Sequence, residues 1–153
     1  MSRAFMKESD GAEGEELVEL QLSPHRNLVT SEGLAQIQAA VERLRAGLAA
    51  ARGADDRAAI KRIQRDLRYW SERQRTAELV QPAAGGKARF GSLVMLGRAD
   101  GSRVEYRIVG EDEADPAHGK ISYVSPIARL LIGAAVGDEF GLPDGTAEIL
   151  EIR

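Results

Sequence analysis

Cysteine is absent from this sequence of 153 residues. Without a thiol the chain can form no disulfide, no thiolate metal site and no cysteine nucleophile, and this composition fits a reducing compartment. Histidine is scarce as well, and its two copies, His25 and His118, lie far apart in the sequence. We therefore expect neither a zinc site nor a histidine-based catalytic centre.

Long apolar runs are also missing. No stretch approaches the ~18 to 20 apolar residues that a membrane span needs, and residues 1–16 lack the apolar core of a signal peptide. The formal net charge of -3 argues against a protein that coats bare nucleic acid, because phosphate binding needs a cationic surface. We expect a cytoplasmic protein without membrane contact, in which any contact with nucleic acid is local.

Residues 1–29 are rich in acidic residues and glycine. They contain only one short apolar alternation, formed by Val18, Leu20 and Leu22. This composition predicts an acidic flexible tail that ends in an extended segment lying against the body of the protein.

A helical pattern begins at Thr30, which is a suitable N-cap. Apolar positions alternate spacings of three and four in two stripes: Leu34, Ile37, Val41, Leu44, Leu48 and Ala51, then Ile60, Ile63, Leu67, Trp70, Gln74 and Ala77. Between them, Gly53 is a helix breaker and Asp55 is the predicted N-cap of the second helix. So short a connection makes the helices antiparallel, which predicts a helical hairpin, or coiled coil, over residues 30–80.

A second domain is predicted over residues 87–153, after the helix-ending Pro82, Gly85 and Gly86. Alternating patterns predict strands at 90–96, 103–109, 120–124, 136–142 and 146–152, with an acidic loop at residues 111–116. A short helix is expected from Ser125 and Pro126, with Ile127, Leu130, Leu131 and Ala134 on its buried face. The predicted fold class is α+β: an antiparallel helical hairpin followed by an antiparallel β domain with one short helix.

Several motifs in the second domain carry a resemblance to a known family. The stretch Val109-Gly-Glu-Asp-Glu-Ala-Asp-Pro is followed by Gly119-Lys-Ile-Ser, Ser125-Pro-Ile-Ala-Arg-Leu-Leu-Ile-Gly and Val136-Gly-Asp. Together these motifs resemble the C-terminal domain of the Gre-type bacterial transcription elongation factors, and Thr30-Ser-Glu-Gly-Leu resembles the entry into that family's coiled coil.

The resemblance implies an FKBP-like C-terminal domain that binds bacterial RNA polymerase at the rim of its secondary channel. It also implies that the coiled coil inserts through this channel towards the active centre. Such a protein is an accessory factor rather than an enzyme, and it meets nucleic acid only within the transcription complex. We expect a monomer.

The turn between the two predicted helices contains two acids, Asp55 and Asp56. In Gre factors, acids at the coiled-coil tip help to hold a catalytic magnesium ion of the polymerase and so promote cleavage of backtracked RNA. The family's tip motif, which reads like Asp-Leu-Ser-Glu-Asn-Ala-Glu-Tyr, is absent here. Asp55 and Asp56 are therefore the candidates for sharing this magnesium, with no cofactor bound stably. The alternative is that they only cap a helix.

A row of basic residues follows the turn. Arg57, Lys61, Arg65 and Arg68 lie at spacings of four, four and three, so they form one stripe on the second helix. The stripe could guide RNA phosphates, whereas a solvated helix face is the alternative.

A further candidate site is the corner that opens the predicted short helix. Val124, Ser125, Pro126 and Ile127 match the position of the family's polymerase-docking surface. Capping by the serine and packing of the isoleucine also explain these residues without a partner.

Three functions remain open at this point. The first is an elongation factor that acts on paused or backtracked complexes by stimulating transcript cleavage. The second is a binding-only regulator similar to Rnk proteins, which the short hairpin favours. The third is a prolyl isomerase, which needs an aromatic-lined pocket for which only Phe90, Tyr106, Tyr123 and Phe140 are available.

Overall fold

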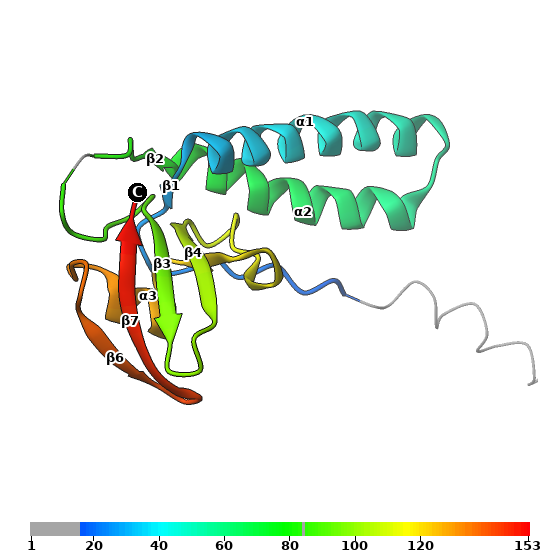
Figure 1. Cartoon of the computed structure of the whole chain (residues 1–153). Coiled ribbons are helices and arrows are strands. Elements are labelled where there is room, and N and C mark those ends of the chain that lie inside the picture. Colours follow the sequence, from blue (N-terminus) through cyan, green and yellow to red (C-terminus); the bar gives the residue numbers. More distant parts are fainter. Residues whose placement is uncertain (1–15, 84) are drawn as a thin grey trace, which may run out of the picture.

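A helical hairpin stands out from a small β-rich domain (Figure 1). The computed structural model describes residues 16–83 and 85–153, so about half of the predicted acidic tail, residues 1–15, lies outside the described residues. Helix α1 spans Ser31–Gly53 and helix α2 spans Arg57–Thr76. The α+β class is confirmed, and α1, with its 23 residues, is about 34 Å long at 1.5 Å per residue.

Apolar side chains join the two helices along the predicted stripes. Ile37 and Val41 of α1 are fully buried, and Leu67 of α2 is half-buried. The prediction fails at the last turns of α2, where Gln74 is exposed and its neighbour Arg73 is buried. At this level the helix no longer faces only α1. It also meets the β domain, whose acidic groups pair with an arginine and not with an amide.

The β domain contains a five-stranded sheet in the order β5-β4-β3-β7-β6. Its strands are β3 (Leu93–Arg98), β4 (Arg103–Val109), β5 (Lys120–Ser122), β6 (Glu139–Leu142) and β7 (Gly145–Ile152). The expectation of a purely antiparallel sheet is wrong for one pair, because β4 and β5 are parallel. The connection between them includes the 3₁₀ helix Pro116–His118. It is long enough to bring the chain back to the end of the sheet where β4 begins, as parallel pairing requires.

One short helix packs on this sheet. Helix α3 spans Pro126–Leu131 and buries Ala128 and Leu131 in a core that includes Leu96, Ile108 and Ile149 of the sheet. Leu130, which was expected on the buried face, is 47% exposed. A six-residue helix presents one narrow face to the sheet, and Ala128 and Leu131 already occupy it.

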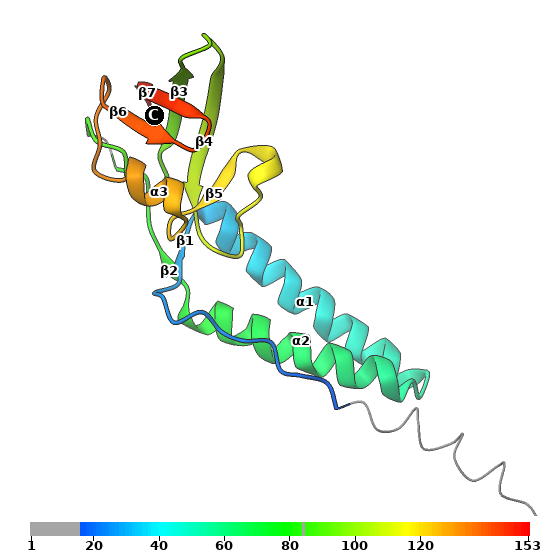
Figure 2. The same cartoon turned by 90° about the horizontal axis from the view of Figure 1, so that it is seen from below.

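A small parallel ladder lies at the base of the hairpin, where the chain enters α1 and leaves α2 (Figure 2). Strand β1 (Leu28–Val29) pairs with β2 (Glu78–Leu79). This ladder was not predicted, because two residues are too few to show a periodicity in the sequence. Within residues 16–83 and 85–153, no helix combines the length and the apolar character needed to cross a membrane.

Candidate functional site

The tip of the hairpin is a three-residue connection. Helix α1 ends at Gly53, and Asp55 takes a positive φ of 52°, a left-handed conformation that aspartate tolerates better than most residues. The N-cap of α2 is Asp56 and not Asp55 as predicted, since the Ala59 N–H donates to Asp56 Oδ1 at 3.1 Å. The two acids therefore have different structural roles, one in the turn and the other in the helix cap, although both are exposed.

Replacing Asp56 by alanine should lower the free energy of unfolding by about 1 kcal/mol, since α2 loses its cap. Asp56→Asn should be close to neutral, because asparagine caps as well as aspartate. Thermal unfolding followed by circular dichroism at 222 nm measures both variants. Equal losses for the two substitutions would contradict a capping role.

The tip offers a limited set of oxygen ligands for a magnesium ion. Asp56 Oδ1 accepts the capping hydrogen bond, whereas the Asp55 carboxylate makes no hydrogen bond to any other described residue. In the part of the chain that the structure describes, no group of three or more His, Cys, Asp or Glu residues could hold a metal. Two carboxylates suit Mg²⁺ only where another molecule supplies further oxygen ligands.

The tip half of the hairpin is basic although the whole chain is acidic. Between residues 42 and 68 there are eight basic and four acidic residues. Four of the basic residues form the predicted stripe on α2, and the structure divides them into two pairs. Arg57 and Lys61 are exposed and form no ion pair with another described residue, whereas Arg65 pairs with Asp66 at 2.9 Å and Arg68 pairs with Glu19.

The base of the hairpin is held by a polar cluster at the end of α2. Arg73 Nε donates to Asp112 Oδ2 at 2.6 Å, and the Tyr69 hydroxyl donates to Asp112 Oδ1 at 2.5 Å. Burial and the hydrogen bond to Asp112 raise the pKa of Tyr69 to about 12. Asn27 completes the cluster, because it accepts from Arg73 Nη2 at 2.8 Å and donates to the Arg73 carbonyl at 2.7 Å.

A second contact holds the start of α1. The Thr30 hydroxyl donates to Glu113 Oε1 and at the same time accepts the capping hydrogen bond of the Gly33 N–H at 2.9 Å. A Cβ atom at Gly33 would lie 2.7 Å from Glu113 Oε1, so a larger residue would force the Glu113 side chain to shift. Lys120 Nζ, 3.8 Å from Glu113, supplies the nearby positive charge.

Asp112 and Glu113 are consecutive residues of the acidic loop after β4. One contacts the end of α2 and the other contacts the start of α1. The sequence predicted only an acidic loop here, and neither contact was foreseen. The only local signal was the presence of three adjacent acids, Glu111 among them, in an otherwise ordinary turn.

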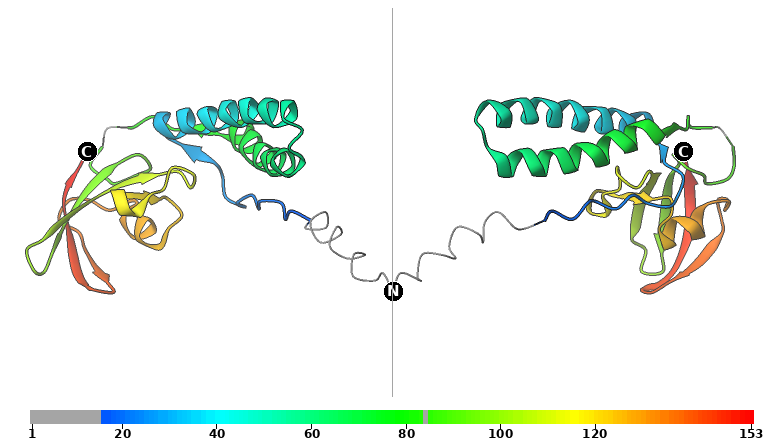
Figure 3. Two further views of the ribbon diagram at one scale, coloured as in Figure 1. Left: turned by 90° about the vertical axis from the view of Figure 1, so that its right-hand side faces the viewer. Right: turned by 180° about the vertical axis from the view of Figure 1, so that it is seen from behind.

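The predicted docking corner lies in the β domain, far from the tip (Figure 3). Ser125 caps α3 by accepting from the Ala128 N–H at 3.3 Å, and Ile127 packs against the core. Pro126 is the exposed member of the corner, while Val124 is half-buried. Close to it in sequence, the apolar Leu130, Ile132 and Val136 are exposed as well.

Comparison with known proteins gives matches in the same part of the chain. The family model described as transcription elongation factor, GreA/GreB, C-term, matches residues 81–153. Transcription elongation factor GreB of Neisseria meningitidis is 42% identical over 95 residues, which cover 59% of this chain and 58% of that protein. Transcription elongation factor GreA of Hyphomonas neptunium is 52% identical over 61 residues, or 39% of each chain.

Among solved structures, the GreA factor homolog 1 protein of Thermus thermophilus matches with a TM-score of 0.41 and 20% identity, covering 84% of this chain and 99% of that one. The sequence matches to the curated relatives, by contrast, span only about half of the length of those proteins.

Proposed function

Because residues 81–153 of this chain belong to the GreA/GreB family of C-terminal domains, we propose that the protein is a transcription elongation factor that binds bacterial RNA polymerase. In this proposal the β domain docks at the rim of the secondary channel. The hairpin then enters the channel towards the active centre, where paused or backtracked complexes hold the transcript. The polymerase supplies the active site and its magnesium ion.

The observation that carries this proposal is the fixed attachment of the hairpin. Asp112 and Glu113, both within the segment that matches the family, hold the end of one helix and the start of the other. Buried, charge-assisted hydrogen bonds of this kind restrict rotation about the junction. A docked β domain would therefore aim the tip in one direction, which a probe of a narrow channel requires.

Two modes of action fit a hairpin in the channel. In the first, Asp55 and Asp56 contribute carboxylates beside the polymerase's magnesium and stimulate transcript cleavage. In the second, the protein occupies the channel without promoting cleavage, as a binding-only regulator of Rnk-like type. The second mode is favoured by the engagement of Asp56 in the helix cap and by the excess of basic residues around the tip.

The test is to measure binding to bacterial RNA polymerase and, separately, transcript cleavage in backtracked complexes. Binding together with cleavage above the basal rate supports the first mode, and binding at the basal rate supports the second. Absence of binding would reject the proposed function altogether. A prolyl isomerase assay with a proline-containing peptide should give no activity, because Phe90 and Tyr123 pack edge to face against each other, with ring centroids 5.4 Å apart, and so are engaged with each other.

Substitution of the docking corner should weaken polymerase binding without unfolding the domain. Glutamate also suits the first turn of a helix, so Pro126→Glu should preserve α3. The substitution places an unpaired carboxylate in the proposed interface. We expect the affinity to fall by about tenfold or more, which corresponds to ~1.4 kcal/mol. The matched control is Pro143→Glu in the exposed turn between β6 and β7, which should bind like the wild type. Equal affinities of the two variants would show that the corner does not contact the polymerase.

A further inference from the structure

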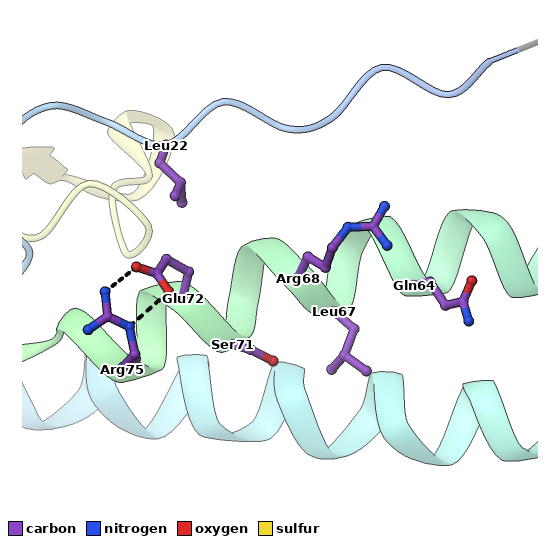
Figure 4. A pocket seen from close by; sticks show the side chains of 7 residues that line it. All are labelled: Leu22, Gln64, Leu67, Arg68, Ser71, Glu72 and Arg75. Carbon is purple, nitrogen blue, oxygen red and sulfur yellow. Dashed lines mark hydrogen bonds and ion pairs between the residues drawn. The ribbon is translucent and has the colours of Figure 1, made fainter.

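Residues 16–26 form an extended segment that lies beside α2, and we call this segment the strap (Figures 2 and 4). The strap leads into β1 and is therefore continuous with the base of the hairpin. It covers part of the same helix that carries the basic stripe.

The end of the strap nearest β1 is held by its continuity with the β1–β2 ladder and by several side-chain contacts, of which the pair between Arg26 and Glu78 is solvent-exposed. Arg26 forms a two-point ion pair with Glu78, with Nη2 at 2.9 Å and Nε at 3.1 Å from the carboxylate oxygens. The Tyr123 hydroxyl donates to the Arg26 carbonyl, and the Ser23 hydroxyl donates to Glu111 at 2.9 Å. Because β1 then pairs with β2, this end cannot leave without disrupting the base of the hairpin.

The other end of the strap rests on α2 through two weak contacts. The Glu19 carboxylate receives hydrogen bonds from both Nε and Nη2 of Arg68 on the exposed surface. Leu22 lies at the rim of a groove of about 650 Å³. The α2 side of this groove is lined by Gln64, Leu67, Arg68, Ser71, Glu72 and Arg75.

The outer end of the strap gains little from burial. Leu17 is half-buried, but Val18 is 79% exposed, Leu20 is 40% exposed and Leu22 is 47% exposed, so three of these four apolar side chains remove little surface from water. The ion pair between Glu19 and Arg68 is solvent-exposed, and such pairs are weak and sensitive to salt. The strap is thus fixed at one end and displaceable at the other.

The Glu19 carboxylate lies against Arg68 of α2, in a position that suits a phosphate group. A guanidinium binds carboxylate and phosphate through the same two-point geometry. The hydrogen bond and the charge of Arg68 lower the pKa of Glu19. Arg65, one turn away on the stripe, adds to this lowering through its charge. Arg57 and Lys61 continue the stripe towards the tip without ion pairs among the described residues.

We propose that the strap is a built-in cover for the Arg68 end of the basic stripe on α2, which single-stranded nucleic acid displaces by placing a phosphate on Arg68 where Glu19 now lies. The identification of this nucleic acid with the transcript rests on the proposed function. Departure of Leu22 then opens the α2 side of the groove, lined by residues such as Leu67 and Ser71, to a base or a sugar. The cover lowers binding to bare RNA outside the transcription complex and gives way where the local RNA concentration is high.

The first test compares two matched double variants of the full chain. Glu19→Gln/Leu22→Ser removes the two contacts with α2, whereas Glu16→Gln/Val18→Ser removes the same charge and a similar apolar side chain from exposed positions. Binding of a fluorescent oligouridylate is measured by anisotropy at low salt. We expect the first variant to bind about fivefold more tightly than the wild type, from the size of exposed ion pairs, and the control to be unchanged.

The second test locks the strap in place. Because the chain has no cysteine, Leu22→Cys/Ser71→Cys can be joined specifically by a reducible bis-methanethiosulfonate. The locked protein should bind the oligouridylate more weakly than its reduced form, and a reductant should restore the affinity. Equal affinities of locked and reduced protein, equal affinities of the two double variants, or no RNA binding by any form would each overturn the proposal.

Polymerase binding by the same variants distinguishes failure of the strap proposal from failure of the proposed function. Docking through the β domain does not involve the strap, so all variants should bind polymerase like the wild type. Intact polymerase binding with no effect on RNA affinity rejects the strap alone, whereas loss of polymerase binding by the wild type rejects the proposed function.

Discussion

Replacing Asp112 by alanine should lower the free energy of unfolding by about 3 to 5 kcal/mol, because the charge of Arg73 then stays buried without its partner. The side chains of Arg73 and Asp112 are only 4% and 10% exposed. The Tyr69 hydroxyl loses its acceptor in the same variant. Glu111 remains 3.8 Å from the guanidinium and compensates in part, so we expect a loss in the lower half of this range.

Trp70, the single tryptophan, is a natural reporter for this experiment. Its ring packs edge to face on Tyr69, with 5.1 Å between the ring centroids, so its fluorescence responds to the junction. Urea unfolding followed at this tryptophan gives the stability difference. The control is Asp66→Ala, which breaks the partly exposed pair with Arg65 and should cost less than about 1 kcal/mol.

A compensating double variant tests the cause of the loss. Arg73→Met/Asp112→Leu removes both charges and leaves none buried alone, so it should recover much of the stability. If this variant is no more stable than Asp112→Ala, packing rather than charge explains the effect. Similar small losses for Asp112→Ala and Asp66→Ala would contradict a structural role of the buried pair.

Those parts of the fold that depend on local patterns could be predicted from the sequence. The stripe through Ile37 and Val41 predicted α1, and the caps Thr30 and Ser125 are confirmed because capping involves only the next three residues. The prediction of Asp55 as the cap of α2 was wrong, because Asp56 is the cap. Which aspartate caps the helix depends on which residue of the connection takes the left-handed conformation, and either aspartate tolerates that conformation.

Features that join distant segments could not be predicted in this way. Arg73 and Asp112 are 39 residues apart, and Thr30 and Glu113 are 83 residues apart. No periodicity relates such pairs, so an arginine on a helix and an acid in a loop each suggest a solvated surface when considered alone. The parallel pairing of β4 with β5 depends in the same way on the path of the intervening loop.

Replacing both tip acids by asparagine should abolish any cleavage that the wild type stimulates, lowering the stimulated rate by about 100-fold towards the basal rate, since carboxylates beside a catalytic metal contribute several kcal/mol. Asparagine can cap α2 at position 56 and tolerates the left-handed conformation at position 55. The variant therefore removes two charges while it preserves the shape of the tip, which alanine at Asp55 and Asp56 would not do.

The measurement is transcript cleavage in backtracked complexes at saturating concentrations of each variant, together with the affinity for polymerase. Glu42→Gln serves as the control, because it removes an exposed acid from α1 several turns away from the tip. Full stimulation by the asparagine variant would show that the carboxylates take no part. A wild type that binds without stimulating would instead identify the protein as a binding-only regulator, in which Asp56 caps a helix and the basic residues around it dominate the charge of the tip.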